Sequence, residues 1–579
     1  MAAKNCQQCK QQFEITAEDT EFLTMLKVPE PTFCPQCRLL RRFIWRSERT
    51  LFKRPCGLCK QEKILMYSPD SPHSVFCYPC WWSESWDAKT YARDYDFTRP
   101  FFEQFKELLL AVPRPGIIKQ GQSINSEYTN RVTDMKNCYL VFATTGAENS
   151  RYSTWIMSSK ECLDCFGTQK SERCYECIDC SQCYSVAFSQ ESNNCSDSWF
   201  LLNCMNVQNS FGCVNLKNKQ YCIWNEQYTK EEYEKKIAEL NIHSARSVEL
   251  LRKKFDEFKR QFIVPALVVR QGMRVSGNWI DHCQDVSRSF TCRNVQNVRY
   301  GLSLFDAKDS MDFNHWGATA ERMYEVQNCG RQIANLKFAN ECWEQVIDCE
   351  YVMNCHGSKD LFGCVGMKKS QYCILNKQYT KEEYETMVGK IKMQMDTTPY
   401  IDKRGLVYKY GEFFPSDLSP FVYNETMGHD FFPLSKEDAI VAGYGWRDEP
   451  QRNYKITMQP DELPDSAADA GDEVTKAIIS CAHNGCMHQC TTAFRILPED
   501  LTLYKLASLP LPRLCPNCRH YERIAKRNPL TLWPRSCQCP GAATHQHGET
   551  QCQNQFETSY APDRPEKVYC IECYQQEVA

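Results

Sequence analysis

The feature that most constrains this chain is its cysteine content, because 37 of its 579 residues are cysteines and many stand in C-x2-C pairs. A turn of this spacing places two thiolates on one metal ion, whereas disulfide frameworks are typical of small secreted domains. The first ten residues lack the apolar stretch of a secretion signal, and no apolar run of about 18 residues occurs. We therefore expect reduced thiols, bound zinc, a cytoplasmic location and no membrane contact.

The overall composition excludes several broad classes of protein. Hydrophobic residues make up 42% and aromatic residues 12% of the chain, which is typical of a globular protein and not of a disordered one. The net charge of −3 gives no general nucleic-acid or membrane signature. A chain of this length predicts about three to five domains, and it leaves the oligomeric state open.

Two internal duplications organise the chain. The segment from Phe211 to Tyr233 recurs as Phe362 to Tyr384, and the segment from Phe13 to Arg38 recurs near the other end as Phe494 to Arg519. The stretch from Asp461 to Glu473 is rich in acids and reads as a solvated linker. The predicted domains are a double zinc unit (1–90), two related central modules (91–270 and 271–458), the acidic linker (459–476) and a second double zinc unit (477–579).

The terminal cysteines predict about four zinc ions, each held by two C-x2-C-like pairs. The N-terminal ligands form two sets: Cys6, Cys9, Cys34 and Cys37, then Cys56, Cys59, Cys77 and Cys80. The third set contains Cys490, Cys515 and Cys518; Met487 holds the position that matches Cys6, so we expect Cys486 to be the fourth ligand. The last set contains Cys552, Cys570 and Cys573, with either Cys537 or Cys539 as the fourth ligand and His545 and His547 as further candidates.

The pattern from Cys6 to Arg38, C-x2-C-x3-F-x-I followed by P-x-P-x2-C-P-x-C-R, resembles the bacterial probable zinc-ribbon (treble-clef-like) domain family. The resemblance covers about 35 residues at each end, and the whole chain resembles uncharacterised multi-zinc-ribbon proteins of candidate-phyla bacteria. It implies zinc and a small β-rich fold at both termini. It implies no activity.

We expect no enzyme. His547-Gly-Glu549 before Cys570-x2-Cys573 is similar to a zinc deaminase signature, but Tyr569 stands where that signature needs proline. A set of four thiolates also leaves no open coordination position for a substrate. Common phosphate-loop, nucleophile-elbow and dinucleotide motifs are missing. A catalytic site built from surface carboxylates on the centre is the minor alternative.

The centre predicts a duplicated parallel β-solenoid with short capping helices, so the whole fold is expected to be mainly β, flanked by paired zinc-ribbon or treble-clef units. Its cysteines follow a period of nine, and we expect them to stack inward as small apolar groups. The clearest series are Cys165, Cys174 and Cys183, then Cys195, Cys204, Cys213 and Cys222. The alternative for the tight run Cys174, Cys177, Cys180 and Cys183 is a metal site. Thr229-x2-Glu232 and Thr380-x2-Glu383 predict capped helices at the end of each module.

A basic and aromatic strip lies between the zinc pairs at each end, and it predicts binding of RNA or a ribonucleoprotein, because cations neutralise phosphates while aromatic rings stack on bases. The residues are Arg41, Arg42, Trp45 and Arg46, with Arg523, Arg527 and Trp533 in the C-terminal copy. The bland alternative is a solvated basic loop with its aromatic rings turned inward. The sequence thus favours a zinc-stabilised, RNA-binding scaffold, with a scaffold for protein–protein assembly as the second hypothesis.

Overall fold

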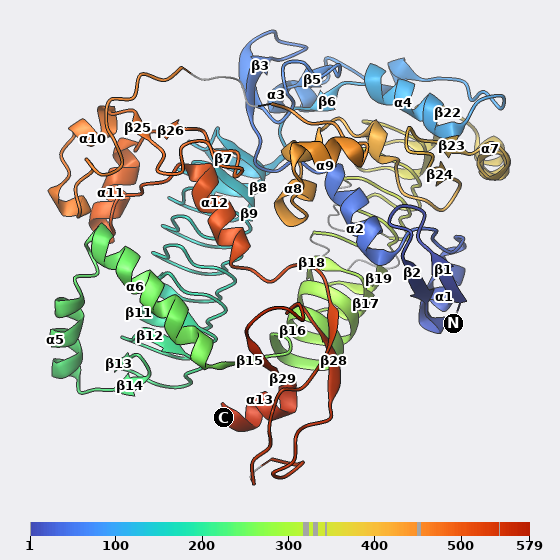
Figure 1. The fold of residues 1–579 in the computed structure, drawn as a ribbon. Coiled ribbons are helices and arrows are strands. Elements are labelled where there is room, and N and C mark those ends of the chain that lie inside the picture. The colour runs from blue at the N-terminus through green and yellow to red at the C-terminus, as the bar shows by residue number, and fades with distance from the viewer. Residues whose placement is uncertain are drawn as a thin grey trace.

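The computed structural model describes residues 2–315, 323–327, 334–341, 344–448, 453–543 and 545–578. It is mostly sheet, with a curled parallel sheet in the centre, several helices packed around it and cysteine-rich units at both ends (Figure 1). Among the described helices, none combines the length and the apolar character needed to cross a bilayer.

The first half of the centre is a curled parallel sheet that advances by twelve residues per turn. Its strands are β7 (Lys119–Ile124), β8 (Thr129–Lys136), β9 (Val141–Thr145), β10 (Tyr184–Ala187), β11 (Ser196–Leu202) and β12 (Phe211–Val214). From β8 onward the register is twelve: Thr129 pairs with Val141, and Tyr184 pairs with Ser196, whereas β7 and β8 pair with a shift after Gln120. Single parallel bridges such as Glu148 to Lys160 continue this register between the longer strands.

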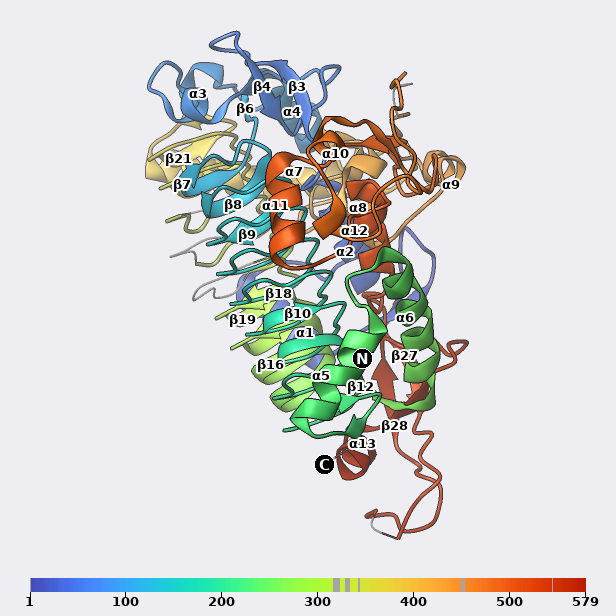
Figure 2. The ribbon, with the colours of Figure 1, turned by 90° about the vertical axis from the view of Figure 1, so that its left-hand side faces the viewer.

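The second half has the same register over most of its length. Its strands are β16 (Val269–Arg293), β17 (Gln296–Arg299), β18 (Leu302–Phe305), β19 (Lys308–Met311), β20 (Lys359–Phe362) and β21 (Gln371–Ile374). Gln284 pairs with Gln296, and Lys359 pairs with Gln371. The two halves lie side by side, and Figure 2 shows their turns stacked along one direction.

Each turn is built from four steps of three residues, which explains the cysteine pattern. In one step Leu163 bridges to the next turn, Asp164 has φ of 55°, and the Cys165 side chain points inward with 1% exposure. The inward positions are filled mainly by cysteine, serine and valine, with larger side chains such as Ile156 and Leu201 in the same buried cluster. The Cys165 thiol donates to the carbonyl oxygen of Cys174 at 3.2 Å.

The described central cysteines point inward, as predicted, but they do not stack on one another at the predicted period of nine. Because the backbone bridges join residues twelve apart, Cys162 lies under Cys174, whereas Cys165 and Cys174 stand on successive sides of the turn. The nine-residue period therefore marks three steps and not one full turn. Cys329 and Cys342 lie outside the described residues.

Helices pack against the curled sheets: α4 (Phe101–Ala111), α5 (Lys230–Leu240), α6 (Ala245–Phe258) and α7 (Lys381–Thr397). Two of them, α5 and α7, begin at the two predicted capping boxes. Helices α6 and α7, however, pack along the sides of the curled sheets and not over their ends: α6 contacts Glu176 through Arg252 and Phe200 through Phe255, on different turns. The Thr229 and Thr380 hydroxyls accept hydrogen bonds from the Glu232 and Glu383 amides at 3.2 and 3.3 Å. Tyr233 on α5 and Tyr384 on α7 are buried against the sheets.

The acidic stretch from Asp461 to Glu473 is not a solvated linker. Three apolar residues in it, Leu463, Ala467 and Ala470, are buried with the C-terminal unit, as is Val474 directly after it. The Asp465 carboxylate accepts a hydrogen bond from the Arg246 amide at 3.0 Å, which fixes the stretch to the start of α6. The excess of acids predicted a linker, but the acids face outward while the apolar residues between them pack inward.

Candidate metal centres

The first cysteine set is assembled by a hairpin and a helix. β1 (Ala2–Asn5) and β2 (Gln12–Ile15) pair antiparallel, and Cys6 and Cys9 lie in the turn between them. α1 (Ala17–Leu26) follows, and α2 (Pro35–Ile44) begins directly after Cys34 and carries Cys37. The four Sγ atoms lie within 4.8 Å of one another. The Cys34 amide donates to Cys6 Sγ at 3.3 Å, a bond that favours a thiolate on Cys6.

The second set repeats this construction. β3 (Phe52–Pro55), β4 (Glu62–Leu65) and α3 (Tyr78–Trp82) bring together Cys56, Cys59, Cys77 and Cys80. The Cys77 amide donates to Cys56 Sγ at 3.3 Å. Burial, followed by the neighbouring thiols of Cys77 and Cys59, raises the pKa of Cys80 to about 12. Four crowded thiolates therefore require a cation to compensate their charge.

The third set contains Cys481 where the sequence predicted Cys486. β25 (Ile479–Ser480), β26 (Ala493–Phe494) and α12 (Pro516–Ala525) gather Cys481, Cys490, Cys515 and Cys518. Cys481 takes the position expected for Cys486, because the Cys515 amide donates to Cys481 Sγ at 3.2 Å, as Cys34 does to Cys6. A longer turn between the first two cysteines hid this match, and Met487 is 79% exposed.

The fourth set contains Cys537, one of the two candidates that the sequence left open. β27 (Trp533–Ser536), β28 (Gln555–Thr558) and α13 (Ile571–Glu577) bring together Cys537, Cys552, Cys570 and Cys573. The Cys570 amide donates to Cys537 Sγ at 3.2 Å, so Cys537 is the counterpart of Cys56. Cys539 Sγ instead lies 3.1 Å from His545 Nδ1.

These four sets fit zinc well. Soft thiolate donors in groups of four suit a tetrahedral structural zinc ion, with zinc–sulfur bonds of about 2.3 Å. Sγ pairs such as Cys9–Cys34 at 3.7 Å and Cys59–Cys77 at 3.9 Å match the edge of such a tetrahedron. The termini are therefore compatible with several zinc ions.

Three arginines of α2 are buried on the second curled sheet. The Asp312 carboxylate accepts from Arg38 Nε at 2.7 Å and from Arg42 Nη1 at 3.0 Å. Arg41 bonds Glu325 at 2.5 Å and Glu412 at 2.9 Å. α2 therefore anchors the first zinc unit to the second sheet by buried, charge-assisted hydrogen bonds.

α12 makes matching contacts with the first curled sheet. The Asp164 carboxylate accepts from Arg519 Nε at 3.0 Å and from Arg523 Nη1 at 2.8 Å. Arg527, just after the helix, bonds Asp179 at 2.5 Å, and its guanidinium lies 4.1 Å from the centre of the Trp279 ring. Asp164 thus corresponds to Asp312 in its role.

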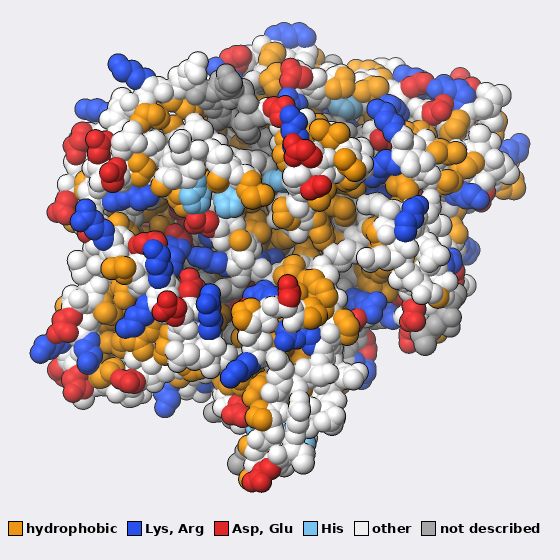
Figure 3. Space-filling view, in the orientation of Figure 1, with side chains coloured by type: hydrophobic (Ala, Val, Ile, Leu, Met, Phe, Trp, Pro, Cys, Tyr) orange, Lys and Arg blue, Asp and Glu red, His pale blue; other side chains and the backbone are white. Residues whose placement is uncertain are grey.

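These positions correct the predicted RNA-binding strip. Arg41, Arg42 and Trp45 are at most 1% exposed, Arg46 is 3% exposed, and Arg523 and Arg527 are 2% and 5% exposed. The Arg46 guanidinium bonds Glu48 at 2.6 Å, and the Trp45 ring packs on Phe414. Only Trp533, on β27, is partly exposed. Buried cations with carboxylate partners form no phosphate-contacting surface. On the face in Figure 3, acidic and basic side chains are interspersed.

The docking of the terminal parts is crossed. The first N-terminal set contacts the second sheet, where Tyr300 donates to Asp19 at 2.9 Å, and the matching Tyr152 of the first sheet donates to Asp500 at 2.6 Å. The second cysteine set of each terminal part lies next to the other sheet. β5 (Val75–Phe76) pairs with β6 (Arg114–Pro115) before the first sheet, and β29 (Lys567–Tyr569) pairs with β15 (Ile263–Pro265) before the second. Each terminal part therefore spans both sheets.

A groove of about 250 Å³ lies between the two sheets, with an adjoining hollow that shares Gly167, Gln169, Thr291 and Phe305. Three buried side chains on its wall have a polar atom without a hydrogen-bond partner in the described part of the chain: Arg46 Nη1, Arg131 Nη1 and His315 Nε2. Burial, together with the charges of Arg46 and Arg131, holds the pKa of His315 well below its usual range, so its imidazole is neutral. Ile118, Val132 and Trp155 make much of the remaining wall apolar.

Comparisons with protein-family models, curated proteins and solved structures give no match to this chain. The likeness of its ends to a zinc-ribbon family therefore rests on the motif alone, and the functional argument rests on the geometry.

Proposed function

We propose that the chain is a non-catalytic, zinc-stabilised binding scaffold, in which the two curled sheets are copies of a duplicated β-solenoid and the groove between them receives a partner. The crossed terminal parts hold both sheets in place. The thiolate sets act as structural zinc sites, because four protein sulfurs fill the coordination sphere of each ion. This proposal keeps the scaffold predicted from sequence and replaces its binding surface.

The observation that carries this proposal is the set of unpaired donors in the groove. Arg46 and Arg131 line the groove, and each keeps one buried N–H without an acceptor among the described residues. Such groups are costly, so a small shift of either side chain toward the groove would favour a ligand that supplies acceptors. Arg46 Nη1 and Arg131 Nη1 suit a carboxylate, and the apolar wall suits aliphatic or aromatic neighbours. An acidic, partly apolar peptide segment of another protein combines both features, which favours protein assembly.

RNA fits the groove less well. The Trp155 ring stacks on Phe431 with a centroid distance of 5.5 Å, so one of its faces is covered and does not accept a base. The buried arginines at both ends remove the remaining support for the RNA hypothesis.

The test compares a labelled peptide rich in glutamate and leucine with single-stranded RNA, both at low salt, by fluorescence anisotropy. We expect the peptide to bind the parent protein and the variant Lys160→Trp, which changes an exposed residue outside the groove. The variant Thr145→Trp fills the groove and should weaken peptide binding at least tenfold. RNA binding that Thr145→Trp abolishes, or no peptide binding at all, would overturn the proposal.

A further inference from the structure

The C-terminal zinc units differ from the N-terminal ones in one loop. In the N-terminal sets, Gln7 and Gln8, or Gly57 and Leu58, separate the first two cysteines. The C-terminal loops, 482–489 and 538–551, are longer, and each contains one further cysteine and two histidines. Those residues are His483, Cys486 and His488 in the first loop, and Cys539, His545 and His547 in the second.

We propose that each C-terminal unit holds a second zinc ion, which shares the last cysteine of the set, Cys518 or Cys573, as a bridging thiolate. Each unit would then be a two-ion cluster of five cysteines and two histidines. The two loops reach this same composition with different lengths and a different order of donors, which supports a common chemical requirement.

The geometry of the first cluster supports a second ion. One donor atom from each of His483, Cys486, His488 and Cys518 lies within 4.8 Å of the others. Cys486 Sγ is 3.6 Å from Cys518 Sγ and 3.5 Å from His483 Nδ1. Tetrahedral zinc with bonds of about 2.0–2.3 Å places its nitrogen and sulfur ligands at such separations. Cys518 Sγ is also 3.8 Å from Cys481 Sγ, so it belongs to both groups.

The histidine partners are those of metal ligands. The Nε2 atom of His483 lies 3.3 Å from the Glu522 carboxylate, which leaves Nδ1 free to face Cys486. A ligating histidine typically donates its other N–H to a carboxylate or a carbonyl oxygen, which fixes the ring and its tautomer. His488 Nδ1 is buried and has no hydrogen-bond partner among the described residues, as expected for an atom that awaits a ligand.

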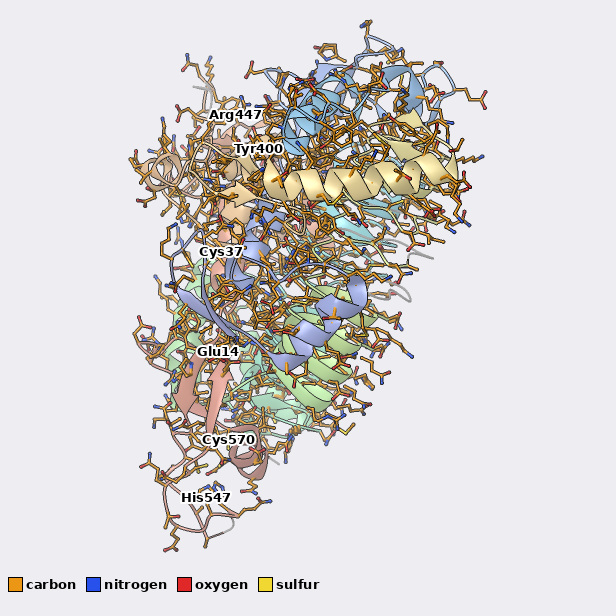
Figure 4. All side chains as sticks on the ribbon, turned by 90° about the vertical axis from the view of Figure 1, so that its right-hand side faces the viewer. Glu14, Cys37, Tyr400, Arg447, His547 and Cys570 are labelled. Atoms are coloured by element: carbon orange, nitrogen blue, oxygen red, sulfur yellow. The ribbon has the colours of Figure 1, made fainter. Side chains whose placement is uncertain are left out.

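The second cluster has the same arrangement. His545 Nε2 lies 3.4 Å from Glu577, while its Nδ1 faces Cys539 Sγ at 3.1 Å. The His547 Nδ1–H donates to the Thr550 carbonyl oxygen at 2.7 Å, and Nε2 lies 3.2 Å from Cys573 Sγ. Glu522 and Glu577 each stand four residues after the shared cysteine, on α12 and α13. Figure 4 shows His547 and Cys570 close to the C-terminal tip of the molecule.

Charge balance also favours the second ion. One divalent ion with four thiolates leaves a net charge of about −2, and a fifth thiolate would make it more negative. A second divalent ion shared among five thiolates and two neutral imidazoles leaves about −1. The first cluster lies beside a cavity of about 600 Å³ lined by His483 and His488, so its second ion is the more accessible one.

The experiment counts the metal ions of the full chain by native mass spectrometry after zinc loading. We expect two ions more than the four cysteine sets hold. The double variants His483→Ala/His488→Ala and His545→Ala/His547→Ala should each lose one ion. The control Gln7→Ala/Gln8→Ala changes the matching N-terminal loop and should lose none. A parent chain that saturates at four ions, or histidine variants with unchanged zinc content, would overturn the proposal.

A second measurement does not depend on the folding of the variants. In the parent chain loaded with cobalt(II), two ions joined by a thiolate couple magnetically, so the electron paramagnetic resonance signal should be smaller than the ion count predicts. A signal equal to the sum of isolated ions contradicts the shared Cys518 and Cys573.

Discussion

The Asp312 carboxylate compensates two buried guanidinium groups, those of Arg38 and Arg42, within the second curled sheet. Asp164 has the same role for Arg519 and Arg523 in the first. A buried ion pair adds little stability compared with apolar packing, but removal of one partner leaves an uncompensated charge in the interior. Substitution of either carboxylate should therefore lower the free energy of unfolding by a large amount.

We expect Asp312→Asn to lower the free energy of unfolding by about 3–5 kcal/mol, because two buried arginines lose their counter-charge. The matched control is Asp448→Asn, whose carboxylate is exposed and pairs with Lys436 at the surface; it should change the same quantity by less than about 1 kcal/mol. Denaturant unfolding followed by circular dichroism measures both. Equal effects of the two variants would show that the Asp312 contacts are not needed for stability.

Glu191 gives a prediction on pH. Burial, and then the nearby Asp179, raises the pKa of Glu191 to about 7, although the Trp279 indole N–H donates to its carboxylate at 3.2 Å. The folded chain holds this proton more tightly than the unfolded chain, whose glutamate has a pKa of about 4.3. The stability of the fold therefore falls as the pH rises from about 4.3 to about 7.

We therefore expect the Glu191→Gln variant to lack this fall of stability with rising pH, since glutamine also accepts the indole hydrogen bond and carries no charge. Relative to the parent, the variant should gain on the order of 2 kcal/mol of unfolding free energy between about pH 5 and about pH 8. Stability curves of variant and parent that run parallel over this range would contradict the buried, protonated glutamate.

At the scale of elements, the three-residue step explains why every third residue, Cys204 and Leu201 among them, lies in the interior of the curled sheet. Cys204 is 2% exposed, and its thiol donates to the Leu202 carbonyl oxygen at 3.5 Å. The turns above and below are fixed by backbone bridges such as Asn193 to Met205, so they do not move apart to admit a larger side chain.

We expect Cys204→Leu to lower the midpoint of thermal unfolding, at a cost of about 1–3 kcal/mol, because extra carbons overfill a closed turn. Cys204→Ser keeps the volume and should cost less. The exposed Lys170→Leu, on the same sheet, serves as the control and should leave the midpoint almost unchanged. If Cys204→Leu unfolds at the parent temperature, the interior has more room than the structure shows.

Local signals predicted the capped helices of the centre and most of the cysteines that the structure groups in fours. The capping boxes at Thr229 and Thr380 and the regular C-x2-C pairs depend on residues close in sequence, so they were readable without the fold. Cys481 was missed because the inserted loop changed the spacing on which the match relied. The arginines of α2 were assigned to the surface because their partners, Asp312 and Glu325, stand about 270 residues away, and no local pattern connects them. The three-residue step could not be read from the sequence, because cysteine, serine and valine follow one another in no fixed order at the inward positions.

At the scale of the whole molecule, the crossed docking joins zinc binding to regions distant in sequence. Loss of the first zinc ion should loosen the second sheet, although Cys34 and Asp312 are far apart in the chain. A structural zinc site supplies folding energy to the unit around it, so a unit without its ion cannot hold α2 in place.

We expect Cys34→Ser to increase hydrogen exchange around Tyr300 and Asp312 more than around Tyr152 and Asp164. Cys515→Ser should show the opposite preference, so each variant is the control of the other. Hydrogen exchange with mass spectrometry resolves these segments. If both variants loosen only the sheet nearer in sequence, the terminal units do not dock as the structure shows.

The crossed docking also constrains the order of events during synthesis on the ribosome. The N-terminal unit emerges first, but the carboxylates that receive Arg38, Arg41 and Arg42 are translated about 270 residues later or more. Until then this unit carries three cations without these partners and an uncovered helix face. Contacts so distant in sequence form slowly, and the waiting chain is open to wrong partners. Release of α12, whose Arg519 and Arg523 complete the contacts to Asp164, is thus a late step in the assembly of the nascent chain.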